Sequence, residues 1–211
     1  MTKINIHYYP YYPSSAAAII AAVCFSLTTI VHTLQVGLKR SWALIPFTVG
    51  GYLEVIGYLC RIISSYQSPD WTLPPFAIET VFILVAPAFF SASIYMLLGR
   101  IMVLVDGESK SIIKRTWLTK IFVCGDVLSL LLQAAGGALI TSQDLHKIDH
   151  GKKIIDAGLF LQIFSFSIFL LTALIFHYRL CRDPTTASTA KGNPWRKHLR
   201  VLYFTSSLVF V

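Results

Sequence analysis

The chain has 211 residues, of which 55% are hydrophobic and only 13% are charged, against about 25% charged residues in a typical soluble domain. The charges gather in short connections and leave long apolar stretches nearly free of them, which excludes a water-soluble globular fold and is typical of membrane spans. The formal net charge of +8 does not indicate a nucleic-acid partner, because the basic residues flank apolar segments and form no contiguous basic domain.

The apolar segments, taken in chain order, predict an all-α integral membrane protein built as a multi-helix transmembrane bundle. Residues 14–36 follow a polar, aromatic leader, and their length of about 23 residues fits one span. Residues 42–65 begin at Trp42, which suits an interfacial anchor. Residues 74–98 contain Pro87, which is expected to kink the third helix.

Three more segments are predicted after a basic connection at residues 99–120. Residues 121–141 and 154–176 are each long enough to cross the bilayer. Residues 199–211 offer roughly a dozen positions where a span needs about 20, so we expect the chain to be cut off inside helix six. Residues 1–211 are thus interpreted as one transmembrane domain.

Polar residues 142–153 and 179–196 are predicted to be solvated connections on opposite sides of the membrane. When Lys and Arg are counted in alternate connections, about 13 lie on one side and 4 on the other. The positive-inside rule places the richer side in the cytosol and therefore the N-terminus outside it.

Ionisable residues inside spans cost at least about 2.5 to 3.5 kcal/mol on insertion scales, so they usually face the protein interior and have partners. In the second segment Gly50, Glu54, Tyr58 and Arg61 share one helix face, with Gly57 beside them. A neighbouring helix can approach closely along such a stripe. Glu54 lies close to the bilayer midplane and is the most costly charge of the chain.

Arg61 in the second segment and Glu79 in the third lie at similar depths near the outer ends of their helices, which predicts an ion pair between them. The alternative is that this pair and Glu54 only lock the two helices together, with Glu54 protonated. The residue types and their spacing do not separate a functional role from this structural one.

The fourth segment carries a second polar face, formed by Asp126, Gln133, Gly136 and Gly137. Gln162 in the fifth segment is placed to meet Gln133. Amide contacts between membrane helices are often packing contacts worth about 0.6 kcal/mol each, so a structural role is favoured for both glutamines. Gln133 and Gln162, like Tyr58, are also candidates for ligand contacts.

Catalytic, cofactor and metal motifs are not indicated. His146 and His150 have helical ligand spacing, but two histidines in a hydrophilic connection favour a solvated loop, so no metal is predicted. The sequence contains no pattern for a nucleotide-binding loop, a catalytic triad or a zinc-hydrolase helix. We therefore predict a protein that is not an enzyme and has no cofactor.

Short motifs in four segments resemble a known family, the fungal lipid-translocating exporters, which are seven-helix proteins related to yeast aminocholesterol-resistance and sphingoid-base-resistance factors. The residues that carry the resemblance are Glu54, Gly57, Tyr58 and Arg61, then Ala86, Pro87, Ala88, Ala92, Tyr95 and Arg100, then Asp126, Gln133, Gly136 and Gly137, and finally Gly158 and Gln162.

The resemblance implies a plasma-membrane or endomembrane protein that exports sphingoid bases or related amphipathic lipids and drugs in a floppase-like manner and confers resistance to stress or toxins. Its partners would be membrane lipids and a cationic, sphingoid-base-like ligand. In this hypothesis Glu54 and Asp126 pair with the cationic head and face one cavity, while Arg61 and Glu79 hold the outer gate. The alternative is a seven-helix lipid receptor or sensor that signals through its basic cytosolic loops.

Overall fold

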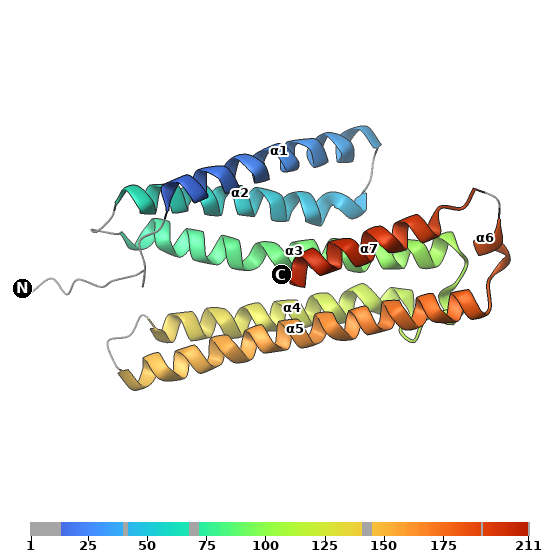
Figure 1. Cartoon of the computed structure of the whole chain (residues 1–211). Coiled ribbons are helices and arrows are strands. Elements are labelled where there is room, and N and C mark those ends of the chain that lie inside the picture. Colours follow the sequence, from blue (N-terminus) through green and yellow to red (C-terminus); the bar gives the residue numbers. More distant parts are fainter. Residues whose placement is uncertain (1–13, 40–41, 68–71, 141–144, 191, 211) are drawn as a thin grey trace, which may run out of the picture. The chain divides into compact units, whose positions relative to one another are not determined.

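The computed structural model describes residues 14–39, 42–67, 72–140, 145–190 and 192–210 (Figure 1). Within these ranges the chain is helical apart from short turns and contains no strand, which confirms the predicted all-α class. The long helices are α1 (Ser15–Lys39), α2 (Ile45–Tyr66), α3 (Leu73–Leu104), α4 (Arg115–Ile140), α5 (Leu145–Arg182) and α7 (Trp195–Phe210). The short ones are η1 (Trp42–Leu44), η2 (Glu108–Lys110) and α6 (Thr186–Thr189).

Four of the described helices, α1, α3, α4 and α5, are long and apolar enough to cross a membrane. α2 has 22 residues but is not in this set, because Glu54 and Arg61 lower its hydropathy. α7 has 16 residues within the described part of the chain, fewer than the about 20 that a span needs. The spans predicted at residues 42–65 and 199–211 therefore stay predictions.

The helices extend beyond the apolar segments that predicted them. α3 continues to Leu104 and α4 begins at Arg115, so the basic connection is shorter than expected. α5 begins at Leu145 and has 38 residues, so the solvated loop predicted at residues 142–153 is helical from residue 145. Apolar content marks the part of a helix that lies in hydrocarbon, whereas the backbone hydrogen bonds continue into the polar layer.

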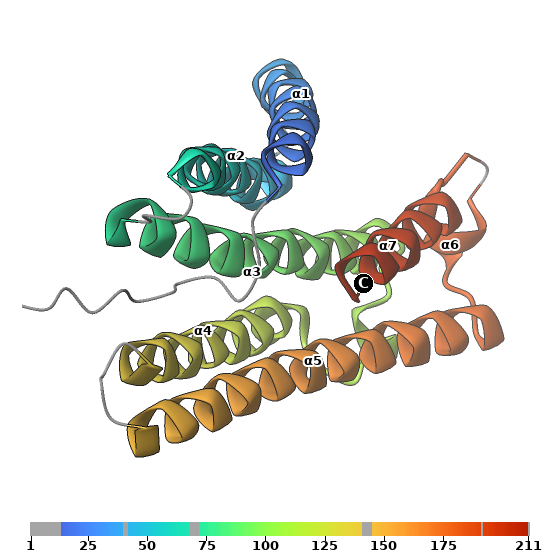
Figure 2. The same cartoon turned by 60° about the vertical axis from the view of Figure 1, so that its left-hand side comes forward.

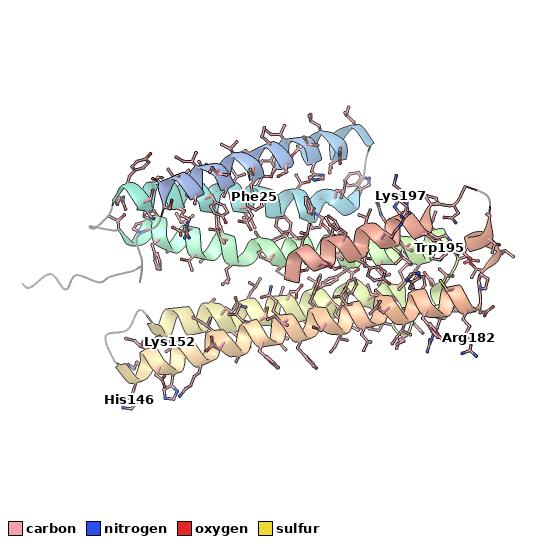
Figure 3. All side chains as sticks on the ribbon, in the orientation of Figure 1. Phe25, His146, Lys152, Arg182, Trp195 and Lys197 are labelled. Carbon is pink, nitrogen blue, oxygen red and sulfur yellow. The ribbon has the colours of Figure 1, made fainter. Side chains whose placement is uncertain are left out.

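Polar residues lie at both ends of the long helix α5. Figure 3 shows His146 and Lys152 at one end of this helix and Arg182 at the other. A surface ion pair between Asp149 and Lys153, with 2.8 Å between Oδ2 and Nζ, lies in the added N-terminal turns. The predicted loop histidines therefore sit on a helix, where His146 and His150 are exposed.

The chain divides into two compact units, Met1–Phe89 and Phe90–Val211, and each is described by itself. In the N-terminal unit α1 and α2 lie side by side (Figures 1 and 2). The described residues buried here are mostly small or polar: Ala18, Ala22, Thr29, Thr48, Gly50, Gly51, Glu54, Gly57, Ser64, Glu79 and Ala86. A Cβ added at Gly51 would collide with Thr29, so α1 approaches α2 through a glycine.

In the C-terminal unit α4 and α5 lie side by side along most of their length (Figure 2). The core here is aromatic and centred on Tyr95, whose ring lies 4.6 Å from Phe169 and 5.4 Å from Phe122, measured between centroids. Large aliphatic and aromatic side chains complete the cluster, among them Leu98, Met102, Leu118, Phe166, Phe176, Leu180, Leu199 and Leu202.

The end of α3 is closed by a turn and then by distant side chains. Asp106 adopts a left-handed conformation (φ 48°), and the N–H of Gly107 donates to the carbonyl of Met102 at 2.9 Å, which is the Schellman pattern of a helix end. The Thr185 hydroxyl donates to the carbonyl of Val105 at 2.5 Å, and the Asn193 side-chain amide donates to that of Leu104 at 3.1 Å.

These contacts give structure to the connection at residues 179–196, whose described residues are mostly exposed, as predicted for a solvated connection. Its polar side chains bind backbone carbonyls that a helix end leaves without partners, and Lys110 forms an ion pair with Asp183. The indole N–H of Trp195 donates to the carbonyl of Ser188 at 3.0 Å. Composition predicted the exposure of this connection, but it does not reveal which acceptors the polar groups meet.

Candidate functional site

Glu54 is one of the two buried carboxylates described in the N-terminal unit, and the other is Glu79. Glu54 lies in the middle of α2 with only 6% of its surface exposed. Its Oε2 atom has no hydrogen-bond partner among the described residues. An acidic oxygen in this position is costly to leave unpaired, so Glu54 is a candidate site for a cationic ligand or a proton.

Arg61 and Glu79 form the predicted ion pair, with 2.6 Å between Nη1 and Oε1. The Glu79 side chain is 3% exposed and that of Arg61 is 25% exposed, so the carboxylate is the more buried member. The pair joins α2 to α3 within the N-terminal unit. Its geometry was predictable because Arg61 lies about as far from the C-terminal end of α2 as Glu79 lies from the N-terminal end of α3.

The remaining candidates on α2 pack against its neighbours. The Tyr58 ring stacks on Phe25 of α1, with centroids 5.6 Å apart and planes at 16°; Figure 3 labels Phe25 between the two helices. A Cβ at Gly57 would lie 2.7 Å from Cγ1 of Ile83 on α3, so this glycine permits a close approach. Gly50 is buried on the same helix, in agreement with the predicted stripe.

Asp126 is the buried carboxylate of the C-terminal unit, with 2% exposure. Its Oδ2 accepts a hydrogen bond of 3.0 Å from the Tyr95 hydroxyl, while Oδ1 has no partner among the described residues. Tyr95 was not predicted as a site residue. The available signal was that Tyr95 is among the residues that carry the family resemblance. It also lies on α3, the helix before the one that carries Asp126.

Gln133 and Gln162 meet as predicted, with 3.1 Å between Nε2 and Oε1. The Gln133 Oε1 atom is buried without a partner in the described chain. Two glycines shape this region: a Cβ at Gly158 would lie 2.8 Å from Cγ of Gln133, and one at Gly136 would lie 2.6 Å from the carbonyl oxygen of Gly151.

Gly137 differs from its neighbour. A Cβ at this position would meet no described atom within 4 Å, so the close approach of α4 and α5 depends on Gly136. Pro87, also predicted as a packing residue, lies inside α3, which continues through it. The predicted kink at Pro87 stays a prediction.

The described residues contain no group of three or more His, Cys, Asp or Glu side chains that could hold a metal ion. His146 and His150 point outward from α5 as exposed residues. Asp144, a carboxylate close to these histidines in the sequence, lies outside the described residues.

The fold and these side chains define a class: a helical integral membrane protein that buries charged and amide side chains within its spans. A family model described as "RTA1 like protein" matches residues 47–211. The chain therefore belongs to the RTA1-like family, and the resemblance to fungal lipid-translocating exporters is confirmed.

Several yeast proteins are similar to the chain. Protein RTA1 of Saccharomyces cerevisiae is 32% identical over 236 residues, covering 100% of this chain and 73% of that protein. Protoporphyrin uptake protein 1 of the same species is 35% identical over 203 residues, covering 80% of this chain and 66% of that protein. The sphingoid long-chain base transporter RSB1 of Saccharomyces cerevisiae is 28% identical over 160 residues, covering 75% of this chain and 41% of that protein. No solved structure matches the chain.

Proposed function

We propose that this protein is a transporter that exports sphingoid bases or related amphipathic amines across a membrane. The observation that supports it is a deeply buried carboxylate in each unit, Glu54 and Asp126, with one oxygen that has no partner in the described chain. A cationic amine is the ligand that such oxygens attract, since the interior offers them no water.

The candidate residues divide by the partners they already have. Arg61 and Glu79 neutralise each other, so their role is to hold α2 against α3 near the predicted outer end. Asp126 accepts one bond from Tyr95 and keeps its other oxygen for a ligand. Gln133 and Gln162 satisfy each other in part and orient a polar tail or hydroxyl group.

The name of one relative, a sphingoid long-chain base transporter, agrees with this chemistry, because a sphingoid base is a cationic amphipathic amine. Another relative is named a protoporphyrin uptake protein, and its ligand is large and amphipathic but carries acidic groups, so that name supports an amphipathic ligand and not the positive charge. The sequence has no nucleotide-binding motif, so the driving force in this proposal is an ion, a proton or the ligand gradient. The proposed site of action is the plasma membrane, with the N-terminus outside the cytosol.

The test is efflux of a labelled sphingoid base from liposomes containing the purified chain, with the yeast sphingoid long-chain base transporter as the assay's positive control. We expect flux above empty liposomes, and a fall of about tenfold or more in Glu54→Gln and Asp126→Asn, because each change removes the charge that pairs with the amine. Asp156→Asn, which alters an exposed carboxylate on α5, is the matched control and should keep its flux.

Absence of flux from correctly folded protein would contradict the proposal. If the labelled base then bound without crossing the membrane, and binding recruited a cytosolic partner, the receptor alternative would take its place. If all three variants kept the flux of the wild type, transport would stand but Glu54 and Asp126 would have a structural role only.

A further inference from the structure

Pro87 leaves a gap in the hydrogen-bond ladder of α3. The helix continues through Pro87, but proline has no N–H, so the carbonyl of Ile83 cannot receive the bond that the residue four positions later would donate. In a membrane interior no water replaces that bond, and an unsatisfied carbonyl is costly. A donor from another helix would remove this cost.

The register between α2 and α3 is fixed by two contacts. Arg61 meets Glu79 at 2.6 Å, and a Cβ at Gly57 would lie 2.7 Å from the Ile83 side chain and 3.4 Å from its backbone nitrogen. Four residues back along α2 thus correspond to four residues forward along α3, so the helices are antiparallel.

This register places Glu54 level with the turn that contains Ala86 and Pro87, since both helices rise 1.5 Å per residue. The carbonyl of Ile83 points toward the same turn. Ala86 is fully buried at this level of α3, and its side chain is a single methyl group.

At this depth Glu54 and Ile83 each have a polar group that lacks a hydrogen-bond partner of the opposite kind. Glu54 Oε2 is buried and has no partner in the described chain, and the Ile83 carbonyl has lost its helical donor. We propose that Glu54 carries a proton and donates it to the carbonyl oxygen of Ile83 that Pro87 leaves open. One hydrogen bond then satisfies both groups and joins α2 to α3 at the proline.

The bond makes Glu54 a proton site whose state is linked to α3. When the carboxyl group loses its proton, a carboxylate faces a carbonyl oxygen, and the contact becomes repulsive. The titratable side chains that share the interior of this unit are His32 on α1, Tyr58, Cys60 and Arg61 on α2, and Glu79 on α3. Arg61 is held by Glu79, so it does not replace the proton on Glu54.

The proton also suggests how transport would be coupled. A cationic amine that reaches Glu54 takes the place of its proton, so one positive charge enters and one leaves as H⁺. This exchange rests on the proposed function, whereas the bond between Glu54 and Ile83 does not. The experiment below therefore measures only the bond.

The test is a double-mutant cycle on the unfolding of the full chain in detergent, with Glu54→Leu, Pro87→Ala and the combination. Leucine at position 54 leaves the Ile83 carbonyl without a donor and should raise the unfolding constant about tenfold. With alanine at position 87, a backbone N–H restores the helical bond, so the same leucine change should have almost no effect. Equal effects of Glu54→Leu in both backgrounds would overturn the proposal.

A second measurement applies even if Glu54→Leu does not fold. Infrared difference spectra between the wild type and Glu54→Gln should show the carbonyl stretch of a protonated carboxylic acid at neutral pH. That band should shift to higher frequency in Pro87→Ala, where the acid no longer has Ile83 as its acceptor. Absence of the acid band, or a band that Pro87→Ala leaves unchanged, would refute the hydrogen bond.

Discussion

The N-terminal and C-terminal units bury different kinds of side chain. In the C-terminal unit the described core is a continuous cluster of large apolar residues around Tyr95 and Phe169. In the N-terminal unit the buried positions are glycines, alanines, hydroxyl groups and two carboxylates. Lipid tails are as apolar as leucine, so membrane helices associate through close packing and polar contacts. The N-terminal unit uses close packing and polar contacts, and the C-terminal unit adds a cluster of tightly packed aromatic rings.

This difference teaches which unit is sensitive to charge. Removing a ring from the C-terminal unit leaves a void whatever the protonation state of the protein. In the N-terminal unit the association of α2 with α3 depends on Arg61, Glu79 and Glu54. We expect the packing of α2 on α3 in the N-terminal unit to respond to protons, whereas in the C-terminal unit the aromatic cluster holds the fold around Asp126.

The largest effect should come from the aromatic cluster. Phe169→Ala removes a fully buried ring that contacts Tyr95 and Phe122 and should cost about 4 kcal/mol of unfolding free energy, as a large cavity does. Leu171→Ala, on a side chain that is 56% exposed, is the control and should change little. Denaturant titration in detergent measures both. Equal losses would contradict a core built on the buried rings of this unit.

Breaking the ion pair should have the next largest effect. Arg61→Ala leaves the Glu79 carboxylate buried without its cation and should cost about 3 kcal/mol, at the low end of buried pairs because Arg61 is partly exposed. The double variant Arg61→Gln with Glu79→Gln removes both charges and should recover most of the loss. If the double variant were less stable than Arg61→Ala, charge burial would not explain the effect.

The neighbouring glycines of α4 offer a matched pair. Gly136→Ala places a methyl group against the Gly151 carbonyl of α5 and should cost about 2 kcal/mol through overpacking. Gly137→Ala meets open space and should be neutral or stabilising by up to about 1 kcal/mol, as alanine favours the helix. Thermal unfolding of both variants decides the comparison, and a reversed order would contradict the described packing of α4 on α5.

The smallest effect should come from the amide pair. Gln162→Leu removes the acceptor of the Gln133 amide and should cost about 0.6 kcal/mol, the average for polar contacts between membrane helices. The same unfolding assay applies, with Gln133→Leu as the reciprocal change. A cost above about 2 kcal/mol would show that the pair belongs to a larger buried network.

Depth along a helix was enough to predict part of this arrangement. The distances of Arg61 and Glu79 from the helix ends predict their ion pair, which the structure contains. Such matching works because every helical residue advances by the same rise. It gives the level of a residue but not the rotation of its helix about its own axis.

The rotation of each helix about its own axis, which decides which side chains face each other, could not be predicted from the sequence. Tyr95 and Asp126 lie 31 residues apart, and only the packing of α3 on α4 shows that they face each other. The same limit applies to Gly136 and Gly137, which have the same residue type but different neighbours. The hydrogen bonds of the connection after α5 could not be predicted for another reason, since its polar residues bind backbone carbonyls that carry no signal in the sequence.

The cap on the C-terminal end of α3 also sets an order of folding during synthesis of the protein. The hydroxyl of Thr185 and the amide of Asn193 reach carbonyls that precede them by 80 and 89 residues. At a synthesis rate of about 5 to 20 residues per second, α3 waits roughly 4 to 18 s for these groups to leave the ribosome. During that interval two of its last carbonyls must rely on water, so the helix end completes its fold only after α4 and α5 have been made.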